Sequence, residues 1–340
     1  MSQENTTILI PANTMQALLT SILSKEGFTN EQALQCSTVF TNNSVDGIAT
    51  HGINRFPRFV QNVKDGFVKP AATPLLKHKF GGIEQWNGQL GPGISNAMQA
   101  TERATQLATE HGIGCVALSN TNHWMRGGSY GWQAAKAGYV FIGFTNTTGN
   151  MPAWGAKDAR LGNNPLVIAL PYKEEAIVLD MAMSQFSFGA MESAAMKNER
   201  LSVNGGYDKN GILTDEPAEI LATGRPLPVG YWKGAGLALL LDLLATILSG
   251  GLATHEISKT KTEHALSQVF IAIDISKLGN HSAIGAMIEN IILDYHRSVL
   301  TGDAKQILFP GERVLATRKE NLANGIPVIK KIWEEINGLV

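Results

Sequence analysis

The sequence predicts an α/β protein in which a mixed β-sheet, largely buried, is flanked by helices. The first observation is that short apolar runs alternate with helix-periodic segments through the middle of the 340-residue chain. Such alternation is typical of a sheet covered by helices. The second observation is that both ends of the chain are helix-periodic. We therefore expect a helical subdomain built from the N- and C-terminal segments.

The N-terminal segment predicts three helices. The first carries apolar residues at i, i+3, i+4, i+7 and i+8, which are Met15, Leu18, Leu19, Ile22 and Leu23. Asn13 can cap its start and Gly27 can end it. A second helix begins at Thr29 or Asn30, and a third covers 55–64. A glycine-flanked turn at 46–52 separates the second helix from the third.

The middle of the chain supplies the sheet. Strands are expected at 113–118, 140–145, 166–170, 177–180 and 268–274, and helices at 94–111, 130–136, 231–249 and 283–299. The stretch 197–228 is rich in Gly, Asp and Asn, which predicts an ordered excursion from the sheet that contains turns and is not a linker. The tail is helical again, with an amphipathic segment at 328–336. We therefore expect segments 1–75, 76–309 and 310–340, the last packing on the first.

Composition excludes several classes of protein. The net charge is −1 without a basic run, so we expect no nucleic-acid partner. Two cysteines, Cys36 and Cys115, fit a reduced cytoplasmic setting. Residues 1–5 lack a basic start to a secretory signal. The apolar run 234–253 contains Asp242, which favours a buried helix over a membrane span. Only 17% of residues are charged, which suggests a surface covered by oligomerisation.

Familiar cofactor and metal motifs are absent from the sequence. The letters G-x-G-x-x-A occur at 112–117, but a helix precedes them and the apolar run itself is the strand. A dinucleotide loop needs the order strand, turn, helix, so an ordinary Rossmann domain is not expected. No P-loop, H-E-x-x-H, H-x-H or C-x-x-C motif occurs. We therefore expect no metal ion.

Two histidines lie in turns with glycine nearby. His51 is followed by Gly52, and His123 precedes Gly127 and Gly128. Imidazole suits proton transfer near neutral pH, and Arg55 can present its guanidinium to a carboxylate. A structural role, in which each histidine only hydrogen-bonds its loop, remains the alternative from residue type alone.

Longer stretches around these residues carry a resemblance to a known family. They are 51–59 (HGINRFPRF), 122–135 (NHWMRGGSYGWQAA), 151–157 (MPAWGAK), 164–166 (NPL), 180–181 (DM), 230–234 (GYWKG) and 310–311 (PG). From about residue 13 onward, the chain resembles the malate/L-lactate/sulfolactate dehydrogenase family. The resemblance implies a nicotinamide-binding fold that is not Rossmann, and places cofactor and substrate binding in 76–309.

The resemblance also implies residue roles in the reduction of a 2-oxo acid. His51 matches the proton donor, His123 matches a second catalytic histidine, and Arg55 and Thr145 match substrate-binding positions. The cofactor contacts map to Ala176, Ile177, Val178, Leu179, Asp180, Met181, Ala182, Trp232, Lys233, Gly311, Glu312 and Arg313. Two departures are Thr50 and Ala182, since the family usually has Ser before the histidine and relatives have Ser after Asp-Met.

The implied cofactor is NADH, with NADPH as the alternative. Asp180 favours NADH because a carboxylate can accept from the ribose hydroxyl, whereas Lys233 suits a phosphate. The implied partners are a small anionic sugar acid and a second copy of the chain, with the cofactor between subunits, and no membrane. Because the net charge gives no global attraction, we expect Arg55, Arg58 and Arg126 to attract the acid locally.

Three other functions stay open at this point. The first is a sister 2-hydroxy-acid dehydrogenase acting on malate, lactate or ureidoglycolate. The second is a sugar-acid or nucleotide-binding protein without catalysis, and the third is a metal-dependent hydrolase. The number of retained candidate site residues favours an oxidoreductase.

Overall fold

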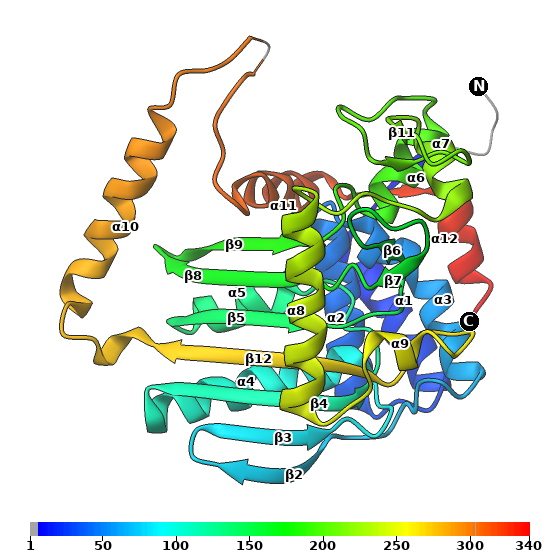
Figure 1. Ribbon diagram of the computed structural model, residues 1–340. Helices are drawn as coiled ribbons and strands as arrows, with labels where there is room; N and C mark the ends of the chain where they lie inside the picture. Colours follow the sequence, from blue (N-terminus) through cyan, green and yellow to red (C-terminus); the bar gives the residue numbers. More distant parts are fainter. Residues whose placement is uncertain (1–5, 303) are drawn as a thin grey trace.

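The centre of the molecule is a seven-stranded sheet in the order β2-β3-β4-β12-β5-β8-β9. A computed structural model describes residues 6–302 and 304–340 (Figure 1), so the expectation about residues 1–5 lies outside the described part. The strands are β2 (Leu75–Phe80), β3 (Ile83–Asn87), β4 (Ile113–Thr121), β12 (Leu266–Asp274), β5 (Tyr139–Thr145), β8 (Leu166–Tyr172) and β9 (Glu175–Met181). Strands β3 and β4 run parallel and the other neighbours run antiparallel, which confirms the mixed sheet.

Helices cover the two faces of this sheet. Helices α4 (Gly93–His111) and α5 (Gly128–Lys136) lie on one face, and α8 (Trp232–Ser249) crosses the other (Figure 1). The first face joins small residues of α4 and α5 to large rings: Ala97, Ala100, Ala104, Ala134, Trp124, Tyr130, Phe141 and Phe270. Alanines let the helices approach the sheet closely, so the rings fill the remaining space.

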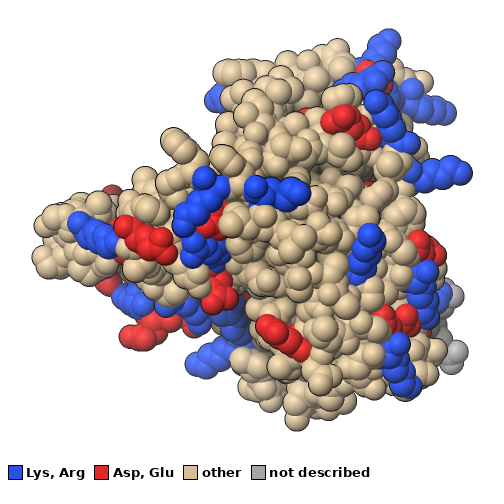
Figure 2. Space-filling view, turned by 90° about the horizontal axis from the view of Figure 1, so that it is seen from below, with Lys and Arg blue, Asp and Glu red and all other residues tan. Residues whose placement is uncertain are grey.

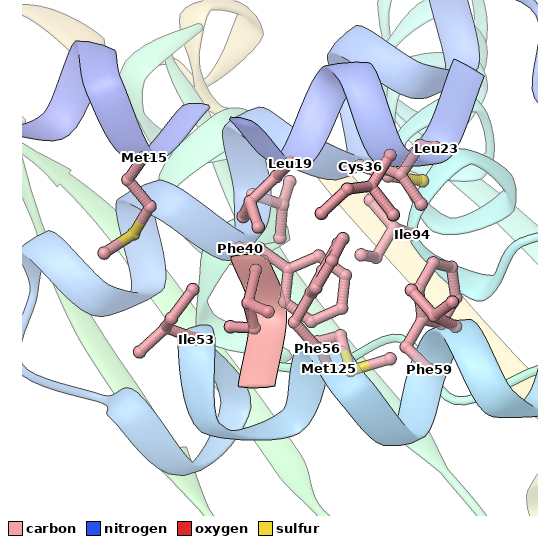
Figure 3. Close-up of a cluster of buried hydrophobic side chains, with 14 of the residues drawn as sticks. Met15, Leu19, Leu23, Cys36, Phe40, Ile53, Phe56, Phe59, Ile94 and Met125 are labelled. Carbon is pink, nitrogen blue, oxygen red and sulfur yellow. The ribbon is translucent and has the colours of Figure 1, made fainter. Parts of the chain in front are cut away.

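A helical layer built from both ends of the chain packs beside the sheet. It contains β1 (Thr7–Ile10), α1 (Ala12–Lys25), α2 (Asn30–Val45), α3 (Phe56–Lys64), α11 (Glu312–Asn324), β13 (Ile326–Ile329) and α12 (Lys330–Asn337). The rings of Phe40, Phe56 and Phe59 meet at its centre (Figure 3), with Phe40 centred 5.2 Å from each of the others. The boundaries at 75/76 and 309/310 stay a prediction.

Two local expectations about this layer are wrong. Asn13 does not cap α1, because the helix begins at Ala12 with Pro11 as its N-cap. Val328 lies in β13 rather than in a helix, because it pairs with Ile8 of β1. That pairing joins the two ends of the chain, so a periodicity taken from the tail alone cannot detect it. Helix α2 begins at Asn30, one of its two expected starts, and the Thr29 hydroxyl caps it by accepting from the Gln32 N–H at 3.2 Å.

The excursion after β9 forms a small unit of its own. It holds α6 (Phe188–Met196), β10 (Gly206–Tyr207), β11 (Leu213–Thr214) and α7 (Pro217–Thr223) around Met191, Leu201 and Ile220. The remaining short elements are η2 (Ala49–His51), η3 (Ile53–Arg55), β6 (Met151–Pro152), β7 (Ala159–Leu161), α9 (Thr254–Ile257) and η4 (Ile275–Lys277).

Helix α8 is buried on one face only, so the expectation of a buried helix is half right. Ala238, Leu241 and Ala245 pack on the sheet. The opposite face leaves these side chains exposed: Leu239, Leu240, Leu243, Leu244 and Ile247. Within the described residues, α8 is the one helix long and apolar enough to cross a membrane. The Asp242 carboxylate accepts from the Asn146 amide and the Thr254 N–H, both at 2.9 Å, which ties α8 to the fold.

Helix α10 (His281–His296) stands away from the body, at the left of Figure 1. Ile292 is its one buried residue, whereas Met287, Ile291, Leu293 and Tyr295 are exposed. An ion pair between Lys173 and Glu289, at 3.0 Å, joins it to the β8–β9 turn. Figure 2 shows the same arm and wide uncharged stretches between charged side chains.

Candidate active site

His51 ends the short helix η2 and is fixed to helix α2 through its backbone. The Asn43 amide donates to the His51 carbonyl at 2.9 Å, and the Ile53 N–H donates to the Ser44 hydroxyl at 2.8 Å. A Cβ on Gly52 would lie 2.3 Å from Ser44 Oγ, so glycine is required at this close approach. The turn that carries His51 is therefore pinned to a buried helix.

His123 lies in a second fixed turn, just after β4. The Asn122 amide donates to the carbonyls of Phe67, Leu90 and Gly91 at 3.0, 2.8 and 3.1 Å. His123 Nδ1 accepts from the Met125 N–H at 3.0 Å. Met125 has φ +63°, an uncommon conformation for a side-chain-bearing residue, and its side chain is buried. Surrounding contacts hold the turn in this shape.

The two turns bring the histidines face to face. Their ring centroids are 5.8 Å apart and the planes differ by 15°. Burial and then the positive charges of Arg55 and Arg126 lower the pKa of His51 to about 4. Burial and then Arg55, His51 and Arg58 lower the pKa of His123 well below its ordinary value. Both rings are therefore neutral near pH 7 in the ligand-free chain.

Arg55 lies beside the histidine pair with its guanidinium available. Among residues 6–302 and 304–340, no hydrogen bond or ion pair to that guanidinium is formed, although the side chain is half-buried. Burial and Arg58 lower its pKa, and the nearby carboxylates of Glu263 and Glu192 oppose that change. A half-buried cation without a partner is suited to bind the carboxylate of a small acid.

Thr145 and Gln268 lie opposite each other on β5 and β12. The Thr145 hydroxyl donates to the carbonyls of Asn146 and Ser267, at 2.9 and 3.2 Å, so toward a ligand it can only accept. Gln268 was not predicted from the sequence. Its amide nitrogen donates to the Asn122 carbonyl at 3.1 Å, and its buried amide oxygen has no partner among the described residues. A glutamine in a mostly apolar strand was the signal by which Gln268 could have been found from the sequence.

Arg126 is not available for the substrate, contrary to expectation. Its guanidinium pairs with the buried carboxylate of Asp46, which also accepts from Arg318 at 2.7 and 3.0 Å. Asp46 belongs to the N-terminal segment, Arg126 to the central one and Arg318 to α11. These ion pairs tie the three segments together, and the sequence spacing did not reveal them.

The expected cofactor residues converge along β9, the edge strand of the sheet. The Val178 N–H donates to the Pro310 carbonyl at 3.0 Å, so Gly311 and α11 begin beside the strand. The Met183 carbonyl accepts from the Val229 N–H at 2.8 Å, so Trp232 and Lys233 follow just beyond the strand's end. Neither α8 nor α11 has a side-chain cap at its N-terminus.

This edge fits a dinucleotide. Strand β9 offers open backbone groups, and the exposed cations Lys233 and Arg313 lie at uncapped helix starts that suit phosphate. Asp180 Oδ2 accepts from the Gly128 N–H at 2.8 Å and lies 3.8 Å from Arg126 Nε, with the side chain 23% exposed. Across the described part of the chain, no cluster of three or more His, Cys, Asp or Glu gathers as a metal site.

Comparison with known proteins supports an oxidoreductase. The family model for malate/L-lactate dehydrogenase matches residues 10–337. The chain is 42% identical over 327 residues to 2,3-diketo-L-gulonate reductase of Escherichia coli O1:K1 / APEC and of strain K12 / DH10B. Those alignments cover 96% of this chain and 98% of each relative.

Solved structures share the fold. Malate dehydrogenase from Entamoeba histolytica superposes with a TM-score of 0.92 at 23% identity, over 98% of this chain and 97% of that one. Sulfolactate dehydrogenase from Methanocaldococcus jannaschii gives a TM-score of 0.90 at 27% identity, over 98% and 96%. The fold and the family expected from the sequence are both confirmed.

Proposed function

The chain belongs to the malate/L-lactate dehydrogenase family, and we propose that it reduces 2,3-diketo-L-gulonate to 3-dehydro-L-gulonate with NADH. The observation that carries the substrate is the 42% identity to 2,3-diketo-L-gulonate reductase over 96% of the chain. The paired histidines with an unpartnered arginine beside them support the same chemistry. A sister activity on malate or sulfolactate is the second candidate, because solved relatives with those names share the fold.

In the proposed reaction Arg55 binds the substrate carboxylate and fixes which face of the C2 carbonyl is presented. A bound reduced nicotinamide supplies the hydride that C2 receives. Negative charge then develops on the carbonyl oxygen, and His51 donates a proton to it. His123 donates a hydrogen bond to the same region, and Thr145 accepts one from a substrate hydroxyl.

Substrate binding also prepares His51 for this role. Arg55 is the largest electrostatic cause that lowers the pKa of His51. A carboxylate bound to Arg55 offsets that positive charge, so the pKa of His51 rises and the ring takes up a proton. The free protein therefore stores a neutral imidazole that becomes a donor when the acid is bound.

We propose NADH rather than NADPH for the residues along β9. No hydrogen bond uses Asp180 Oδ1 among the described residues, so that oxygen can accept from a ribose hydroxyl. A phosphate at the same place would face this carboxylate and be repelled. Lys233 acts in the opposite direction, but it is exposed to solvent, where screening weakens its attraction for a phosphate.

We further propose a cytoplasmic homodimer with the cofactor held between its subunits. The exposed apolar faces of α8 and α10 support a second copy, because large contiguous apolar surfaces mark association sites. The low share of charged residues, 17%, fits the same interface. Both cysteines are free and buried, as in a chain kept reduced.

The decisive experiment measures oxidation of NADH and NADPH with a panel of 2-oxo acids, including 2,3-diketo-L-gulonate, pyruvate, oxaloacetate and sulfopyruvate. We expect the highest kcat/KM with NADH and the diketo acid. His51→Ala should lower kcat by about 100-fold or more while NADH binding, followed by its fluorescence, is retained. Near-normal turnover in this variant contradicts the assignment, and a preference for oxaloacetate would favour the sister activity. Unchanged activity after chelation rules against a metal-dependent hydrolase.

A further inference from the structure

The two histidines differ in how their ring nitrogens are held. His123 Nδ1 accepts from the Met125 N–H at 3.0 Å. His51 Nδ1 lies 3.3 Å from the Thr50 hydroxyl, which can either donate or accept. A nitrogen that accepts a hydrogen bond carries no proton, so neutral His123 carries its proton on Nε2. The hydroxyl contact leaves both forms of His51 open.

The contact at His123 also opposes a second proton on the ring. That proton would have to sit on Nδ1, where the Met125 N–H already points its own hydrogen. The amide cannot easily turn away, because the Tyr130 hydroxyl donates to the Trp124 carbonyl at 2.6 Å and Met125 is buried. Asn122 fixes the other side of the turn through three carbonyls.

We propose that His123 keeps its Nε2 proton throughout the reaction as a fixed hydrogen-bond donor, and that His51 alone gains and loses a proton. This inference rests on the proposed reductase function. No described residue pairs with His123 Nε2, and this atom is not among the fully buried polar atoms without a partner. It is therefore the ring nitrogen left to meet a ligand.

The charged surroundings act on the two rings differently. Arg55 and Arg58 face His123, Arg55 and Arg126 face His51, and each ring faces the other. Glu192 and Glu263 face Arg55. A substrate carboxylate on Arg55 weakens the repulsion that both rings experience. It does not remove the Met125 N–H from His123, so only His51 becomes free to take a proton.

The reaction balances with these roles. C2 receives the hydride, and the carbonyl electron pair moves to the oxygen. The proton that this oxygen takes leaves the His51 imidazolium, which returns to neutral imidazole. His123 Nε2–H stabilises the developing charge without transferring its proton, as a preorganised donor does.

The first test is an NMR titration of the protein labelled with ¹⁵N-histidine, with and without a substrate analogue that is not reduced. The signals of His123 are identified among the eight histidines by their loss in His123→Gln. From about pH 5 to about pH 9 we expect His123 to show the Nε2–H form without titrating. A proton that appears on His123 Nδ1 in this range overturns the proposal. This readout does not depend on turnover.

The second test compares the pH dependence of kcat/KM for three variants. Glutamine places an amide donor near the position of Nε2 but cannot titrate, so His123→Gln should keep the wild-type pH profile and lose about tenfold in rate. His123→Phe, which has no donor, should lose about 100-fold. His51→Gln should lose the proton-dependent limb of the profile.

The result that overturns the inference is a missing limb in His123→Gln together with a retained limb in His51→Gln. Equal losses in His123→Gln and His123→Phe also overturn it, because the amide donor then contributes nothing. If the wild-type protein reduces no acid in the panel, the proposed function is wrong. The NMR titration still decides the state of His123 in that case.

Discussion

Helices α1 and α8 are both rich in leucine and isoleucine, yet the fold uses them in opposite ways. Helix α1 places Met15, Leu19 and Ile22 at 0% exposure inside the helical layer. Helix α8 leaves Leu240 55% and Ile247 69% exposed while its other face covers the sheet. Helix α1 is apolar along one stripe, so packing against a single core buries that stripe. Helix α8 is apolar nearly all round and needs a second surface to cover it.

The helical layer is therefore complete within one chain, whereas the outer face of α8 is not. The helical layer has a buried apolar core of its own and fixes the His51 turn on helix α2. Helices α8 and α10 leave large apolar side chains exposed to solvent. We therefore expect substitutions in the layer to change folding stability and substitutions on α8 to change association.

The largest expected effect is a loss of folding stability caused by a substitution in the core of the helical layer. Phe56 is fully buried and packs edge-on against Phe40 at 5.2 Å. Phe56→Ala leaves a cavity and should lower the free energy of unfolding by about 3–5 kcal/mol. Urea unfolding measures it. Phe80→Ala is the matched control, because Phe80 is 75% exposed on β2 and should change stability by about 0.5 kcal/mol at most. Equal losses of unfolding free energy in Phe56→Ala and Phe80→Ala would contradict a buried core in the helical layer.

An intermediate effect is expected on α8, and it concerns association. Leu240→Glu places a charge in the proposed dimer interface and should weaken association by about 2 kcal/mol, roughly 30-fold in Kd. Leu34→Glu on α2 is the control, since Leu34 and Leu240 are 54% and 55% exposed. Sedimentation equilibrium of both variants measures the dissociation constant. A dimer unchanged by Leu240→Glu would place the interface elsewhere.

The smallest expected effect is on the pH dependence of folding stability, and it arises from His51. The pKa of His51 is about 4 when folded against an ordinary 6.5, so the unfolded chain binds more protons between these values. The stability contribution is present above pH 6.5 and is lost as the pH falls toward about 4. His51→Gln should remove about 1 kcal/mol of this decline, a value reduced for solvent screening. Urea unfolding at several pH values measures the slope, and identical slopes in both proteins would contradict the buried neutral ring.

Much of the architecture follows from local pattern. Ten elements lie close to their predicted positions: strands β4, β5, β8, β9 and β12 and helices α1, α2, α4, α5 and α8. They could be predicted because the periodic spacing of buried apolar residues can be detected within a single segment. The hairpin of β2 and β3 was not predicted. All residues of β2 are exposed, so it has no apolar alternation to detect. Val328 was misassigned because its partner Ile8 lies at the far end of the chain.

The candidate site divides in the same way. Turn glycines and residue type single out His51, His123 and Arg55 from the sequence. Their meeting does not follow from it, since nothing in the spacing says that a turn after α2 stacks on a turn after β4. The same holds for Arg126, whose partner Asp46 lies 80 residues away along the chain.

Local sequence was enough to establish the fold class, the family and the residue types able to bind an acid and transfer a proton. These depend on local periodicity and on side-chain chemistry, which each segment carries with it. Tertiary contacts alone bring the histidines face to face, set the Met125 N–H against one ring nitrogen of His123, and leave Arg55 without a partner among the described residues while Arg126 has one. Those outcomes depend on contacts between segments distant in the chain, where burial strengthens each charge and each hydrogen bond.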